Sequence, residues 1–179
     1  ATHIPGFNGY LSSRFFLRED LWRNRNIFPH ASAIVGMSIA YSENPQGSFS
    51  LDSHQRFTTS TGLTKVNGMA AQAMVKAIQS AKYEGMIIPS DKVWHKLDSI
   101  GKTTPVILID VLYSDGSRAS MSCYHVPGGE DIVAADGTVL EHDPDRFYAL
   151  LSDGRSALVQ RYGLQHLLKT SRDLGFPMQ

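Results

Sequence analysis

The chain alternates between segments with a helical spacing of apolar residues and segments in which apolar residues recur at every second position. The clearest helical spacing covers 68–83, where apolar residues fall three and four positions apart. They are Met69, Ala70, Ala73, Met74, Ala77, Ile78 and Ala81. Asn67, a favoured N-cap residue, precedes them. The pattern predicts a helix over 68–83, ended by Gly85, with Met74 and Ile78 buried against a sheet.

Strand patterns occur at 31–41, 48–58, 105–113, 118–126, 131–134 and 138–141. The best pair is 105–113 with 118–126, because a turn signal, Ser114-Asp115-Gly116-Ser117, lies between them. Asp136-Gly137 is a second signal of this kind and predicts a small hairpin. Gly36 is expected at a bulge in the first strand.

Three further helices are predicted. Ser90 caps a short one over 91–99, with Val93, Trp94 and Leu97 facing inward. Asp143-Pro144 is a helix-start signal, with Phe147, Leu150 and Leu151 on the buried face. After an interruption at 152–154, a last helix is expected over about 156–173, with Leu158, Tyr162, Leu167 and Leu168 inward.

This order of elements predicts an α+β fold: a mostly antiparallel sheet packed against two or more helices, with an extended N-terminal arm. Residues 1–30 form the expected arm, and 31–179 form a single α+β domain. The order helix 91–99, three strands and helix 156–173 resembles that of a double-stranded-RNA-binding domain. The basic start of the last helix that such a domain uses would consist here of Arg155 and Arg161 alone.

The arm interleaves aromatic residues with arginines. The residues expected to bind a partner are Arg14, Phe15, Phe16, Arg18, Trp22, Arg23 and Arg25. Aromatic and arginine side chains dominate protein–protein hot spots, and they also stack on bases and contact phosphates. Three interpretations stay open: packing on the chain's own core, docking on a partner subunit, or binding nucleic acid.

Charge and cysteine content narrow the function classes. The 17 Lys and Arg balance 17 Asp and Glu, so the global basic surplus of many nucleic-acid-binding proteins is missing. One cysteine excludes an internal disulfide and fits a reducing compartment. No signal peptide is recognisable, and no apolar run approaches the roughly 18 residues of a membrane span. We expect a cytoplasmic protein, or one within an assembled particle, that binds no membrane.

The central hairpin carries three residues with catalytic chemistry. If Asp115-Gly116 is a two-residue loop, Val106 lies opposite His125, Leu108 opposite Cys123, and Asp110 opposite Met121. Asp110, Cys123 and His125 would then share one face. A thiol next to an imidazole is the arrangement of Cys–His nucleophilic catalysis, although roughly 10 Å or more would separate Asp110 from His125. The competing interpretation is a packed cysteine and a histidine at a strand end.

An acidic stretch follows at 130–145. Glu141, His142, Asp143 and Asp145 offer oxygen and imidazole ligands for a cation. The competing interpretation is structural, with Asp143 capping a helix and Asp145 favouring its N-terminus. No cofactor is expected.

The sequence lacks the phosphate-binding loop, the dinucleotide-binding fingerprint, the nucleophile elbow and the zinc-protease motif. We therefore expect a non-catalytic structural or assembly subunit that binds other proteins or copies of itself, for example in a virion or another large complex. The alternatives are a small hydrolase or transferase with a non-contiguous site, and an RNA-binding module; nucleic acid is the less favoured partner.

Overall fold

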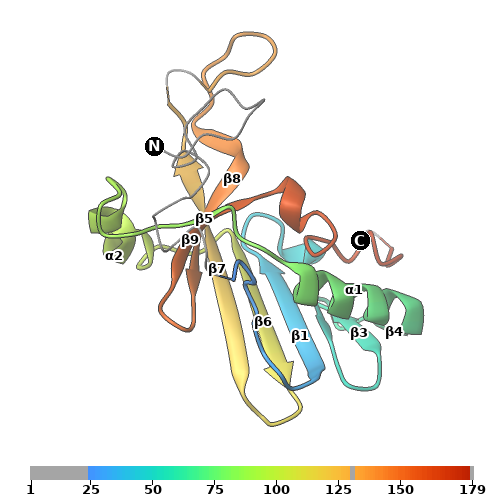
Figure 1. The fold of residues 1–179 in the computed structure, drawn as a ribbon. Coiled ribbons are helices and arrows are strands. Elements are labelled where there is room, and N and C mark those ends of the chain that lie inside the picture. Colours follow the sequence, from blue (N-terminus) through green and yellow to red (C-terminus); the bar gives the residue numbers. More distant parts are fainter. Residues whose placement is uncertain (1–23, 130–131, 178–179) are drawn as a thin grey trace, which may run out of the picture.

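A computed structural model describes residues 24–129 and 132–177 (Figure 1). Its main feature is an antiparallel sheet of nine strands in the order β4-β3-β2-β1-β6-β7-β8-β9-β5. The strands are β1 (Ile34–Tyr41), β2 (Phe49–Leu51), β3 (Arg56–Thr59), β4 (Thr64–Val66), β5 (Gly85–Met86), β6 (Ile107–Tyr113), β7 (Arg118–Pro127), β8 (His142–Leu151) and β9 (Ser156–Gln160). The helices are α1 (Gly68–Ser80) and α2 (Leu97–Ile100), with 3-10 turns η3 (Pro45–Gly47), η4 (Trp94–Lys96) and η5 (Tyr162–Leu164). The predicted antiparallel sheet is confirmed, and the described fold is dominated by it rather than by helices.

The sheet consists of two meanders joined at its centre. Strands β1 to β4 form one meander and β6 to β9 the other. They meet where β1 pairs with β6, with Met37 opposite Val111 and Ile39 opposite Ile109. The register of this pair shifts between Ile34 and Gly36, which confirms the predicted irregularity there.

One face of the sheet carries the core. Side chains alternate across a strand, and here the odd-numbered positions point inward. The innermost side chains, each less than 2% exposed, include Ile39, Phe57, Ile109, Met121 and Val159. Leu164 and Leu167, which follow β9, complete this core together with α1.

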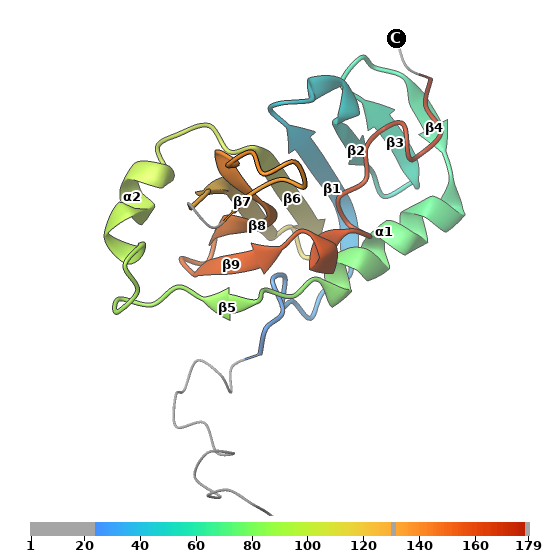
Figure 2. The ribbon, with the colours of Figure 1, turned by 90° about the horizontal axis from the view of Figure 1, so that it is seen from above.

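Helix α1 lies along this side of the sheet (Figure 2). The Asn67 side chain accepts a hydrogen bond from the Ala70 amide, which confirms the predicted N-cap. Met74 and Ile78 are buried as expected, whereas Met69 is 85% exposed and does not belong to the buried stripe. The helix ends at Ser80, before the predicted Gly85, because Ala81 is already extended.

The predicted helices after Asp143 and over 156–173 are wrong. The first segment forms strand β8, and the second begins with strand β9 and continues in short turns. Residues 142–151 form β8, in which Phe147, Ala149 and Leu151 are buried at every second position. Ser152-Asp153-Gly154 forms the turn into β9, and Gly154 adopts a φ of 85° that favours glycine. Without a helix over 156–173, the element order that resembled a double-stranded-RNA-binding domain is not present.

The opposite face of the sheet is covered in part by the predicted 91–99 segment, which folds as η4 and α2. Leu97 is buried and so is Tyr124 of β7, while Trp94 is 37% exposed and does not face inward as predicted. A side chain at Gly101 would contact Leu150 of β8, so this segment lies directly on the sheet.

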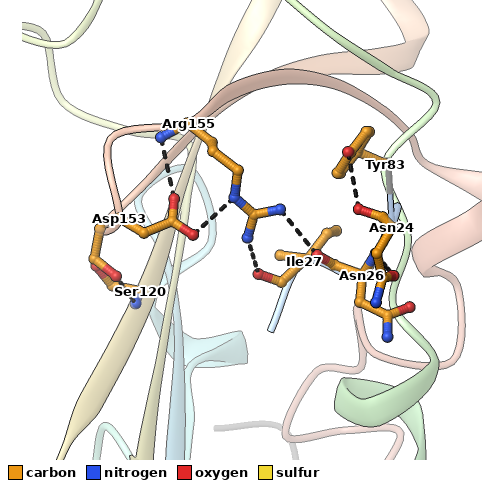
Figure 3. A network of polar contacts seen from close by, with 8 residues as sticks. Asn24, Asn26, Ile27, Tyr83, Ser120, Asp153 and Arg155 are labelled. Atoms are coloured by element: carbon orange, nitrogen blue, oxygen red, sulfur yellow. Dashed lines mark hydrogen bonds and ion pairs between the residues drawn. The ribbon is translucent and has the colours of Figure 1, made fainter. Parts of the chain in front are cut away.

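The end of the predicted arm is fastened to the domain (Figure 3). Ile27 donates to the Ala81 carbonyl and Tyr83 donates to the Arg25 carbonyl, so 25–27 run antiparallel to 81–83. The Arg155 guanidinium donates to the carbonyls of Asn26 and Ile27 at 3.1 and 3.0 Å. Ile27 and Phe28 are buried in the core cluster. Residues 24–28 therefore belong structurally to the domain.

Replacing Arg155 by alanine should destabilise the protein, because two backbone carbonyls lose a charged donor in a partly buried place. Hydrogen bonds to charged groups contribute about 1.5–3 kcal/mol each, and the partial exposure of Arg155 places the loss at the lower end of that range. Urea unfolding measures the change, with Arg118→Ala, an exposed arginine at the neighbouring hairpin, as the control. Equal effects of the two substitutions would show that Arg155 does not hold the segment.

Candidate functional site

The structure separates the predicted catalytic trio. Tyr113 donates to the Ser117 carbonyl, so the β6–β7 loop consists of Ser114, Asp115 and Gly116 instead of Asp115-Gly116 alone. This extra loop residue shifts the pairing by one position: Ile107 lies opposite Cys123, and Asp110 lies opposite Ser120. Asp110 and Cys123 therefore point to opposite faces of the sheet, and the prediction that they share a face is wrong.

Cys123 has the properties of a packed core residue. Its side chain is fully buried, and burial raises the pKa of the thiol to about 12. A thiol that stays protonated at neutral pH is neither a nucleophile nor a metal ligand. The structural interpretation of Cys123 is thus favoured over the catalytic one.

His125 lies at the end of β7, beside the loop that follows β1. Its Nε2 lies 2.8 Å from Oε1 of Glu43. Its ring stacks on that of His142, with ring centroids 4.2 Å apart and an interplanar angle of 1°. The His142 Nδ1 atom is buried and has no hydrogen-bond partner among the described residues. This contact connects the end of β7, the start of β8 and the β1–β2 loop.

The acidic candidates do not converge. Asp143 is buried, but its carboxylate accepts from the Asp145 amide at 2.8 Å and from Arg146 at 3.4 Å. Glu141 is exposed. In the described part of the chain, no group of three His, Cys, Asp or Glu side chains is arranged to hold a metal ion. Asp143 begins a strand and balances Arg146, instead of capping a helix.

Sequence reasoning missed a cluster of serine, histidine and aspartate at the β6–β7 turn. Ser117 Oγ lies 3.1 Å from His30 Nε2 and donates to Asp115 at 2.7 Å. Hydrogen bonds from Ser117 and Ser32 hold the pKa of Asp115 down at about 2. The His30 Nδ1 accepts from the Ser32 amide, so in the neutral ring the proton lies on Nε2, facing Ser117. His30 in this arrangement cannot take a proton from Ser117, and the cluster serves to stabilise the turn.

The predicted partner-binding residues Arg14, Phe15, Phe16, Arg18, Trp22 and Arg23 lie outside the described residues. Arg25 is described: its side chain is exposed, and its carbonyl accepts from Tyr83.

Among the described residues, β4 pairs only with β3 and forms one edge of the sheet (Figure 2). Thr59 donates to the Leu63 carbonyl and Asn67 donates to the Gln55 carbonyl, so 63 and 67 direct backbone groups toward β3. Hydrogen-bonding direction alternates along an antiparallel strand, and the backbone groups of Thr64 and Val66 therefore point outward. All three β4 residues are exposed.

Three exposed apolar side chains lie in or next to β4. Leu63 is 36%, Val66 68% and Met69 85% exposed. A second exposed apolar pair lies apart from β4: Val133 and Val139 face each other in the small hairpin predicted from Asp136-Gly137. We call Leu63 to Met69 the β4 edge. Its open backbone and apolar side chains together are what a further strand needs in order to pair.

One cavity adjoins this edge, since Leu63 is among its lining residues, and a second one lies along α1. The larger, about 630 Å³, is lined by polar residues of the loops around η3 and of the C-terminal segment, including Thr59, Thr61, Ser171 and Asp173. The second, about 370 Å³, lies between α1 and the start of β1. We call it the α1 cleft; Ile34, Val35, Leu51, Ala71 and Val75 contribute to its walls.

Comparison of the chain with models of known protein families, with curated proteins and with solved structures found no match. Among the described residues, no helix is both long enough and apolar enough to cross a membrane.

Cys123 should react with a thiol reagent only after the protein unfolds, because its sulfur is both inaccessible and protonated. Labelling at pH 8 with and without urea measures this, and a Gln79→Cys variant, whose new thiol is exposed, provides the positive control. Labelling of native Cys123 at the rate of the exposed thiol would contradict the assignment.

Proposed function

We propose that this chain is a non-catalytic assembly subunit and that the β4 edge is a contact surface between copies of it. The observation that carries the proposal is the outward backbone of Thr64 and Val66 next to the exposed side chains of Val66 and Met69. Native sheets normally block their edges, because an open edge pairs readily with another strand. Here the edge offers both hydrogen-bonding groups and apolar surface.

Two copies can pair through this edge about a two-fold axis. An antiparallel pair centred on Val66 places the two exposed valines side by side and sets Lys65 opposite the other copy's Asn67, away from the other Lys65. Cross-strand apolar pairs stabilise a sheet, and like charges placed directly opposite each other destabilise it. The balanced charge of the chain adds no net repulsion between copies.

The separation of Asp110 from Cys123 and the high pKa of Cys123 support a non-catalytic role for the central hairpin. The polar 630 Å³ cavity is the observation that favours the enzyme alternative. Its lining offers hydroxyl groups, one arginine and one aspartate, but none of the lining residues is a histidine or a cysteine.

The test is the molar mass of the full chain by light scattering across a concentration series. We expect mass above that of one chain, and a loss of about tenfold or more in association affinity for the V66K/M69K double variant. The V133K/V139K double variant adds the same charge to another exposed apolar pair and should associate like the unmodified chain. A chain that stays single at every concentration would refute the proposal, and so would equal behaviour of the two variants.

A further inference from the structure

We infer that the α1 cleft of one copy binds the Leu21–Trp22 region of the N-terminal segment of a neighbouring copy. This inference rests on the proposed assembly of copies, but it uses a different surface from the β4 edge. Its basis is the cleft, the direction in which the chain leaves the domain, and the charges on both partners.

The cleft suits one large apolar side chain. Its volume is about 370 Å³, and Ile34, Val35, Leu51, Ala71 and Val75 contribute apolar walls. The cleft lies beside the first residues of β1, which have no partner in β2, because β1 pairs with β2 only between Met37 and Ile39. Water next to these apolar walls finds few hydrogen-bond partners. An aromatic ring that replaces this water is stabilised by about 25 cal/mol for each Å² of apolar surface that it buries.

The direction of the chain favours a neighbouring copy over the same copy. Residues 25–27 run antiparallel to 81–83, and 81–83 lead away from the end of α1 toward β5. Followed back from Ile27 to Asn24, the chain therefore leaves along β5, away from α1 and its cleft. The Arg155 and Tyr83 hydrogen bonds fix this exit (Figure 3). Leu21 and Trp22 lie only three and two residues before Asn24, so the cleft that binds them must lie within about 10 Å of this exit, on a copy packed against it.

Charge selects the part of the segment that fits. Lys76 and Asp52 are the charged residues that line the cleft. Asp52 is paired with Arg56 at 2.8 Å, whereas Lys76 forms no ion pair with any described residue. In the N-terminal segment, Glu19 and Asp20 directly precede Leu21 and Trp22. A tryptophan in the cleft would bring these carboxylates near Lys76, which pairs an apolar anchor with a polar rim, as in many interfaces.

Cross-linking between variants that each carry one added cysteine tests the inference, since native Cys123 is buried and unreactive. Full chains carrying Arg23→Cys are mixed with full chains carrying Gln79→Cys and oxidised mildly. Arg23 adjoins Trp22, and Gln79 lies on the cleft. The matched control replaces Gln79→Cys with Lys102→Cys, an exposed position next to α2 on the opposite side of the sheet.

We expect a disulfide-linked pair of the Arg23→Cys and Gln79→Cys chains at several times the control yield. Adding Trp22→Ala should lower that yield about tenfold, as expected when an interface anchor is removed. A pair formed no more than in the control overturns the inference. So does a chain carrying both cysteines that links only within itself. Repeating the experiment with V66K/M69K chains separates this result from the β4 edge. If these chains associate less by light scattering but still form the cross-link, the cleft contact is supported independently of the edge. If they associate as before and no cross-link forms, the cleft contact alone is refuted.

Discussion

The pairing of β1 with β6 is the constraint on which the rest of the fold depends. Each strand is the first of its meander, and the whole segment from β2 to α2 lies between them in the chain. Their inward side chains, Met37 and Ile39 against Ile109 and Val111, are at most 5% exposed. Burial of this kind fixes the register, because a slip of one position would turn every one of these side chains to the open face. The two meanders then place α1, the C-terminal turns and residues 24–28 on the same core.

This architecture also explains where surface groups remain available for contacts with other molecules. The first meander ends in the short strand β4, whose backbone and apolar side chains stay open among the described residues. The other end of the sheet is β5, which lies beside the segment that binds residues 24–28. Polar groups elsewhere are used within the domain: Asp143 with Arg146, Asp153 with Arg155, and Asp115 with Ser117. We therefore propose contact surfaces at the β4 edge and the α1 cleft, where backbone or apolar groups have no partner among the described residues.

Much of the sheet was predictable from local pattern, and two errors have clear physical causes. Residues 143–151 contain both a helix-start signal and an alternation of Phe147, Ala149 and Leu151. Because Ser152-Asp153-Gly154 can close a hairpin as Ser114-Asp115-Gly116 does, the alternation prevails and the segment pairs with β7. The prediction that Asp110, Cys123 and His125 share one face depended on the length of the β6–β7 loop. A single additional residue in that loop, with Gly116 at a φ of 85°, moved Asp110 to the opposite face. The α1 cleft and the open β4 edge depend on which strand ends where, which no local pattern encodes.

Native-state hydrogen exchange tests the central pairing most directly. If β1 and β6 join both meanders into one cooperative unit, the slowest amides of β1, β6 and β7 should exchange only through global unfolding, with the free energy measured by urea. Ile39, Ile109 and Met121 should then share one value, and a destabilising Met74→Asp substitution should lower all three equally. Exchange of the β1 amides at a clearly lower free energy than those of β6 and β7 would contradict the account, because it would mean that the first meander opens independently of the second.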